Sequence, residues 1–253
     1  MSDPHPTYPN PTIVQVTCEI AFAATSDDRL SLGTLYPIFS SEFPEMMPIG
    51  SGTIQFVIGQ PVFAPEAPQS QSPTAAFRFS STSGRRFVQL SKTNFVYQSN
   101  EPYAGWADFR GNLLRLWEIS APHLRPGSVV KVGLRYINRI PKTEDRQSVG
   151  DWLNATPDIP PALLRSKEHF LGRIESSPAH AHLRLVTIAN EVPGPEMPAG
   201  AIIMDVDRLS TEQFDASTQT ISEKLEILHE DVWASFHAAT SDALREHLTG
   251  RNR

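Results

Sequence analysis

The chain has 253 residues, of which 40% are hydrophobic and 20% charged, a composition typical of folded globular proteins rather than disordered ones. A net charge of −6 argues against broad binding to nucleic acid or anionic membranes. Cys18 is the single cysteine, which excludes an intramolecular disulfide and a cysteine-based zinc site. No apolar run reaches the length of a membrane span or of a signal-peptide core, which predicts a cytoplasmic protein.

Alternating apolar and polar residues predict strands through most of the first half of the chain. The alternation is clearest over Ile13–Phe22 and Val129–Ile140, and Cys18 lies on the apolar side of the first, as a small buried hydrophobe would. Between them, Tyr103–Ser120 has apolar residues at helical spacing and predicts a helix. Further predicted elements are a helix over Asp27–Phe43, a loop over Gln60–Pro73, and strands over Thr53–Ile58, Phe77–Ser80, Arg86–Leu90 and Asn94–Gln98.

The second half of the chain begins with a polar stretch, Lys142–Ser177, which predicts a connector with a helix around Ala162–Ile174. Two strands are predicted beyond it, over Leu183–Ala189 and Ala201–Val206. A long helical pattern then closes the chain, and its capping signal at Thr240 and Ser241 indicates two helices rather than one.

These elements predict an α+β protein with two sub-domains, each a mainly antiparallel sheet covered by helices on one face. The predicted N-terminal half spans residues 1–141, the connector 142–177, and the C-terminal half 178–253. The long C-terminal helical segment is the predicted contact surface for a partner or a second copy. On this helix, Trp233 and His237 are four residues apart and share one surface, which makes them candidates for such a contact.

Three motifs carry a family resemblance: YPNPTIVQVTCEIAF over Tyr8–Phe22, YAGW over Tyr103–Trp106, and VGLRYINRI over Val132–Ile140. In order and spacing they resemble a sporadically distributed family of prokaryotic proteins of about this length, which is catalogued as uncharacterised. The resemblance covers essentially the whole chain. It implies a bacterial or archaeal cytoplasmic protein from a mobile or defence-type gene neighbourhood, and it supplies no catalytic residues.

The sharpest signal for catalysis is the pair Asp205 and Asp207. Asp205 lies within the predicted strand Ala201–Val206, and Asp207 follows directly after it, two residues further on. Paired carboxylates on one strand face can hold Mg²⁺ in phosphoryl- and nucleotidyl-transfer sites. The upstream Gly-Ser turn that nucleotidyltransferases need for the phosphates is absent from Val192–Gly200. The competing interpretation is an exposed strand face that pairs with basic residues, and it is the one favoured here.

Lys131, Arg135 and Arg139 form a basic face on the predicted strand Val129–Ile140. Such a face could bind single-stranded RNA or DNA, but the exposed aromatic residues that stack on bases are missing from it. Cross-strand ion pairing with Glu19, Asp205 or Asp207 is the favoured alternative. A buried anchor role for Arg135 in a partner subunit is also open.

The histidines show no spacing typical of a metal site. His180 and His182 are two apart but have no evident third ligand, and Trp233 stands where a zincin helix starting at His229 needs its second histidine. The glycines form no phosphate-binding loop. The sequence therefore predicts no metal site and no cofactor.

The sequence as a whole predicts a non-catalytic binding or regulatory protein that acts through a protein partner and forms a homodimer. One alternative is a Mg²⁺-dependent phosphoryl or nucleotidyl transferase centred on Asp205 and Asp207. The other is a single-stranded nucleic-acid binder that uses Lys131, Arg135 and Arg139.

Overall fold

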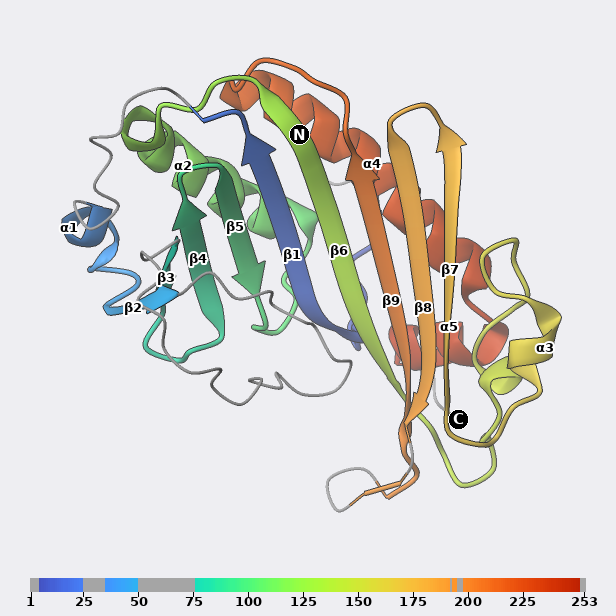
Figure 1. Cartoon of the computed structure of the whole chain (residues 1–253). Coiled ribbons are helices and arrows are strands. Elements are labelled where there is room, and N and C mark those ends of the chain that lie inside the picture. Colours follow the sequence, from blue (N-terminus) through green and yellow to red (C-terminus); the bar gives the residue numbers. More distant parts are fainter. Residues whose placement is uncertain (1–4, 25–34, 50–75, 192, 195–197, 251–253) are drawn as a thin grey trace, which may run out of the picture.

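In a computed structural model of the chain, one antiparallel sheet of nine strands runs through the molecule in the order β2-β3-β4-β5-β1-β6-β9-β8-β7 (Figure 1). The structure describes residues 5–24, 35–49, 76–191, 193–194 and 198–250. The strands are β1 (Ile13–Phe22), β2 (Glu45–Ile49), β3 (Ala76–Ser80), β4 (Arg86–Ser91), β5 (Asn94–Ser99), β6 (Val129–Pro141), β7 (Phe170–Ala179), β8 (His182–Glu191) and β9 (Ala201–Ser210).

The two predicted halves share this sheet, so the expectation of a separate sheet in each sub-domain is wrong. The reason lies in β6, which pairs with β1 along one side and with β9 along the other. Both pairings are long, running from Ile13 to Phe22 on β1 and from Ala201 to Ser210 on β9. The strand with the clearest alternation in the sequence therefore lies at the junction of the two halves and joins them.

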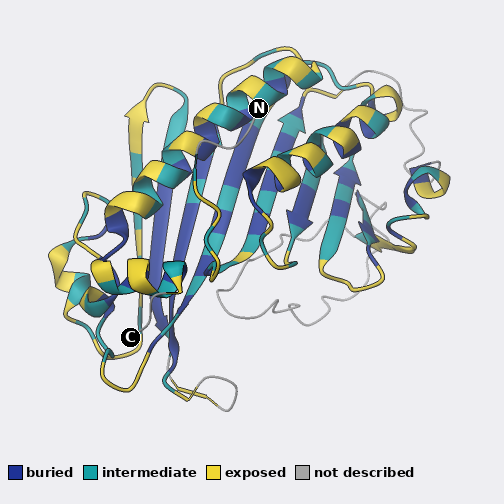
Figure 2. Cartoon of the chain, turned by 180° about the vertical axis from the view of Figure 1, so that it is seen from behind, coloured by how far each residue is buried: buried dark blue, intermediate teal, exposed yellow. Residues whose placement is uncertain are grey.

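The helices α2 (Trp106–Leu124), α4 (Thr218–Ala239) and α5 (Asp242–Thr249) lie on one face of the sheet, behind it in Figure 1 and in front of it in Figure 2. The long helix α2 packs on β5, and α4 packs on β6 and β9. At Ser241 the side chain accepts a hydrogen bond from the backbone N–H of Leu244, which starts α5 at the predicted cap. The remaining helices are α1 (Tyr36–Phe39), the 3-10 helix η2 (Val149–Asp151) and α3 (Pro161–Leu164).

The core lies between this face and the helices. The central strands contribute alternate residues to it, as Val16, Cys18 and Ile20 do from β1, whereas the edge strands β2 and β7 have no buried residue. The apolar stripe of α4 faces the sheet, because Ile221 and Leu225 are fully buried there. The apolar stripe of α4 thus packs on the chain's own sheet, while Ile227 on the same helix is exposed, and the predicted partner contact on this helix stays a prediction.

The stretch Lys142–Ser177, which was predicted to be a connector between two halves, supplies most of a strand of the sheet. The expected helix over Ala162–Ile174 is limited to α3, and the chain continues as the edge strand β7. An edge strand is only half covered, so its sequence carries little of the apolar alternation that reveals central strands. The predicted Thr53–Ile58 strand and Gln60–Pro73 loop lie outside the described residues, and within them the Asp27–Phe43 helix is limited to α1.

None of the described helices combines the length and the apolar character that crossing a membrane requires.

Candidate functional site

The sheet face opposite the helices is the open face. Two basic residues of β6 on this face contact carboxylates of other strands. The Lys131 ammonium lies 2.7 Å from the Glu19 carboxylate on β1. The Arg139 guanidinium lies 3.0 Å from the Glu191 carboxylate on β8. The Lys131–Glu19 pair is one that the cross-strand alternative predicts, whereas Glu191 is not among the predicted partners. A nucleic-acid phosphate would have to displace a carboxylate from each cation.

Arg135 makes the tightest pair of this face. Its Nε donates to one carboxylate oxygen of Asp205 at 2.8 Å and its Nη2 to the other at 2.6 Å. Burial acts to lower the pKa of Arg135, but the hydrogen bonds and charge of Asp205 outweigh it and raise that pKa above its usual value. Asp205 itself is buried, so the pair is a shielded bidentate one. A Mg²⁺ ion at Asp205 would have to displace the guanidinium, which weighs against the transferase alternative.

Asp207 shares the face with Asp205 but has different surroundings. Its backbone lies opposite Arg135 on β6 and Leu185 on β8. Burial raises the pKa of Asp207 to about 6, and the charges of Asp205 and Glu19 add to this rise while Arg135 opposes it. Asp207 is therefore a carboxyl group on the open face whose ionised form the fold disfavours.

Cys18 lies wholly inside the core. Burial, together with the charge of Glu19, holds the pKa of its thiol well above the usual range. The thiolate required of a nucleophile is thus disfavoured, and the expectation of a small buried hydrophobe is confirmed.

Trp233 and His237, the predicted partner contacts, lie on a surface of α4 that the chain's own N-terminal segment meets. The ring of His5 stacks on Trp233 with centroids 4.4 Å apart, and Tyr8 lies on it at 6.2 Å. The ring of His237 also lies next to Trp233, with the two ring centroids 5.8 Å apart. The surface that the sequence offers to a partner is therefore used, at Trp233, for a contact within the chain.

A small cavity of about 60 Å³ lies beneath this segment. Its walls come from the N-terminal residues, from β6, from α4 and from α5, so that parts of the chain far apart in sequence meet there. The lining is mainly apolar, with prolines and aliphatic side chains beside aromatic ones such as Tyr103, Tyr136 and Trp233. Its polar atoms come from residues such as Asn138 and His229. Such a mixture of apolar walls and few polar groups is typical of ligand sites, although this cavity is small.

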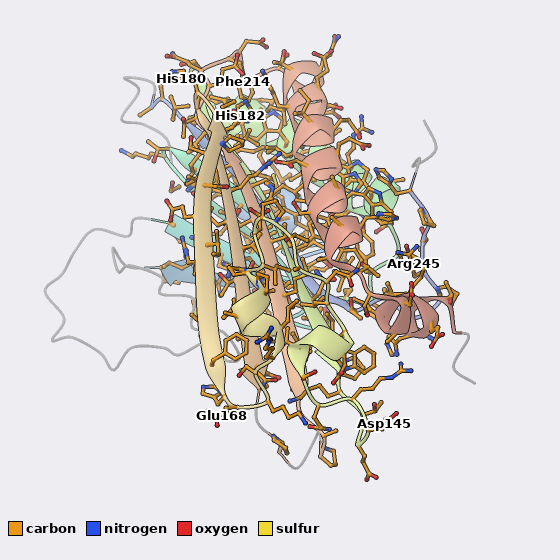
Figure 3. The ribbon with its side chains drawn as sticks, turned by 90° about the vertical axis from the view of Figure 1, so that its right-hand side faces the viewer. Asp145, Glu168, His180, His182, Phe214 and Arg245 are labelled. Atoms are coloured by element: carbon orange, nitrogen blue, oxygen red, sulfur yellow. The ribbon has the colours of Figure 1, made fainter. Side chains whose placement is uncertain are left out.

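His5 and His229, which line this cavity, lie close to the carboxylate of Glu230, and all three side chains can bind a metal. Within the described part of the chain, they are the group whose ligand atoms all lie within 4.8 Å of one another. His5 Nε2 lies 2.9 Å from Glu230 Oε1. The expectation that the histidines do not assemble is therefore wrong for His5 and His229, because no local spacing reveals a contact between residues near opposite ends of the sequence. In contrast, His180 and His182 stand at the end of the β7–β8 hairpin (Figure 3).

A larger cavity of about 310 Å³ lies where β5 leads into α2. Its lining is polar and includes Arg86, Tyr97, Asp108 and Asn112. The Arg86 guanidinium is held by Glu42 at 2.9 Å, so the main cation of this cavity is already paired.

Arg208, which the sequence analysis overlooked, lies on the helix side of β9 with only 1% of its surface exposed. Its Nε lies 3.1 Å from Asp231 on α4, and its Nη2 lies 3.8 Å from Asp158 and contacts Ser235. It is in phase with Met204 and Val206, which the alternation assigns to the core, so that pattern could have predicted a buried arginine.

No protein-family model matches the sequence, and no curated protein is similar to it.

Proposed function

We propose that the chain is a non-catalytic binding or regulatory protein whose first protein partner is a second copy of itself, joined along strand β7. The observation that carries this proposal is the position and pattern of β7. It is a ten-residue strand at the end of the sheet, and among the described strands only β8 pairs with it. A strand at a sheet edge presents unpaired backbone groups that another strand can bind.

The charges of β7 favour pairing with an antiparallel copy. Arg173 and Glu175 flank Ile174 and lie on the same face, 3.6 Å apart, with more than half of each side chain exposed. If two copies of β7 pair with Ile174 at the two-fold axis, each Arg173 lies opposite the partner's Glu175. Opposite charges directly across an antiparallel pair stabilise it by about 0.2–1 kcal/mol each, and symmetry supplies the pair twice.

The two-fold axis at Ile174, together with Pro178, sets the length of the paired segment. The contact reaches from Leu171 to Ser177, because Pro178 lacks the N–H needed to extend the ladder. Leu171, with 59% of its surface exposed, would lie within the new interface. The other edge strand, β2, is half as long, with five residues, and contains Pro48, so it is a poorer template.

The ion pairs of the open face support a non-catalytic role. Asp205, which a transferase would need for its metal, is engaged by Arg135 through both carboxylate oxygens. The cations that a nucleic-acid binder would need, Lys131 and Arg139, are likewise paired. These charged groups form cross-strand pairs that fix the register of the strands, as expected for a scaffold rather than a reaction centre.

Charge reversal tests the dimer. In sedimentation equilibrium we expect the wild-type chain to have twice its monomer mass of 28.1 kDa. Arg173→Glu or Glu175→Arg alone places like charges opposite each other and should weaken the dimer about tenfold to a hundredfold. The double variant Arg173→Glu/Glu175→Arg restores the complementarity and should restore the dimer.

The double variant is also the control for folding, because it carries both changes. A monomeric wild-type protein would contradict the proposal. So would a wild-type dimer that either single variant leaves unchanged, since the copies would then meet elsewhere.

A further inference from the structure

We propose that His5, His229 and Glu230 form a binding site for one divalent transition-metal ion of the zinc class. The site rests on geometry, because two imidazoles and a carboxylate from opposite ends of the chain bring their ligand atoms within 4.8 Å of one another. The closest two, His5 Nε2 and Glu230 Oε1, are 2.9 Å apart.

Aromatic packing fixes both imidazole rings. The His229 ring stacks on Trp106 with centroids 4.2 Å apart and planes only 5° from parallel. The His5 ring stacks on Trp233 at 4.4 Å, and the two imidazole centroids lie 5.6 Å apart. Rings held in this way lose little conformational freedom when a metal binds, which favours binding.

The exposure of the three ligand side chains increases from His229 through His5 to Glu230. His229 is buried, the His5 side chain is 15% exposed, and the Glu230 side chain is 53% exposed. An ion can therefore reach the site from the solvent past Glu230, while the aromatic rings shield its inner side. A shielded inner side strengthens the attraction between a cation and its carboxylate ligand.

The ligand set selects the metal class. Imidazole nitrogens suit Zn²⁺, Ni²⁺ and Cu²⁺, whereas Mg²⁺ and Ca²⁺ prefer oxygen ligands. At zinc-ligand distances of about 2.0–2.2 Å, tetrahedral ligands lie about 3.3 Å apart. The three ligand atoms must therefore approach one another by at most about 1.5 Å, which a small shift of the His5 ring within its stacking plane and a rotation of the exposed Glu230 side chain can supply. Three protein ligands leave the fourth position to water or to a ligand.

A metal here would tie the N-terminal segment to α4. His5 and Tyr8 cover Trp233, and the segment forms one wall of the small cavity. The bound ion would hold this wall in place and make its closure depend on the metal. This role is independent of the proposed dimer along β7.

Zinc titration of the full chain, without a histidine tag, tests the site. By calorimetry we expect one Zn²⁺ per chain, together with a higher thermal midpoint. The variants His5→Ala and Glu230→Gln should each weaken binding at least tenfold. Because Trp106 and Trp233 stack on the two histidines, Cu²⁺ should quench tryptophan fluorescence in the wild type and less in either variant.

The matched control is His180→Ala/His182→Ala, which removes the histidine pair at the end of the β7–β8 hairpin and should leave Zn²⁺ affinity unchanged. The proposal is overturned if the wild type binds no Zn²⁺, if both ligand variants bind it as the wild type does, or if only the hairpin variant loses it.

Discussion

Replacing Arg208 with alanine is expected to lower the free energy of unfolding by about 3 kcal/mol. The guanidinium is almost wholly buried and contacts the carboxylates of Asp231 and Asp158. It also donates to the backbone carbonyls of Leu185 and Asp207. Removing the cation of a buried charged network leaves its carboxylates without a compensating charge, which costs about 3–5 kcal/mol. We expect the lower end of this range because Arg184 still binds Asp231.

Urea unfolding followed by tryptophan fluorescence measures this loss. The control is Arg85→Ala, because the Arg85 side chain is 60% exposed and lies 4.0 Å from Glu101. Surface pairs of this kind contribute little, so the control should change stability by less than about 0.5 kcal/mol. Equal effects of the two substitutions would show that Arg208 does not anchor α4 to the sheet.

Asp205→Asn and Asp207→Asn are expected to change stability in opposite directions at pH 8. Asparagine at 205 removes the carboxylate that Arg135 binds at both oxygens, and we expect a loss of about 2–3 kcal/mol. Asparagine at 207 removes a charge that the fold disfavours, as the raised pKa of Asp207 indicates, and we expect a gain of about 2 kcal/mol.

The pH dependence follows from the pKa of Asp207, which is about 6 in the fold and about 4 in the unfolded chain. Between these values the folded state binds more protons, so stability falls as the pH rises from about 4 to about 6. Above that range the ionised group costs about 2–3 kcal/mol in full, and below pH 4 it costs nothing. The gain from Asp207→Asn should therefore be present at pH 8 and nearly absent at pH 4.

Urea unfolding of the wild type and both variants at these two pH values, at one protein concentration, tests the contrast. A gain from Asp207→Asn that is equal at both pH values would mean that ionisation of Asp207 is not its cause. A stabilising Asp205→Asn would contradict the structural role of the Arg135 pair.

Much of the central sheet could be predicted from the sequence, because its strands are buried on one side and alternate accordingly. The predicted span of β1 agrees with the structure, and that of β6 ends one residue early. The edge strand β7 could not be predicted, since six of its ten residues are exposed and its apolar positions are few. The expected ion pairing of Arg135 with Asp205 or Asp207 pointed to β6 beside β9. The single sheet was nevertheless missed, because the polar stretch Lys142–Ser177 between the two strands indicated a boundary between halves.

The candidate sites divide in the same way. Asp205 and Asp207 share a face, as the two-residue period of a strand requires, but the period does not reveal that Arg135 binds both carboxylate oxygens of Asp205. His5 lies in a proline-rich lead without regular structure, so nothing in its neighbourhood points to His229. Contacts between the ends of a chain follow from tertiary packing and not from local periodicity.

Cysteine cross-linking at Ile174 tests the central claim, the symmetric pairing of β7, most directly. Residues at the two-fold axis of an antiparallel pair have Cβ atoms about 4.5–5.5 Å apart, close enough for a disulfide after slight movement. The native Cys18 is fully buried and does not compete. The control is Leu171→Cys, which is more exposed but would lie about 20 Å from its own copy, six positions along the strand. We predict that mild oxidation converts Ile174→Cys, and not Leu171→Cys, into a covalent dimer on a non-reducing gel. Equal or greater cross-linking of Leu171→Cys would contradict the proposed dimer.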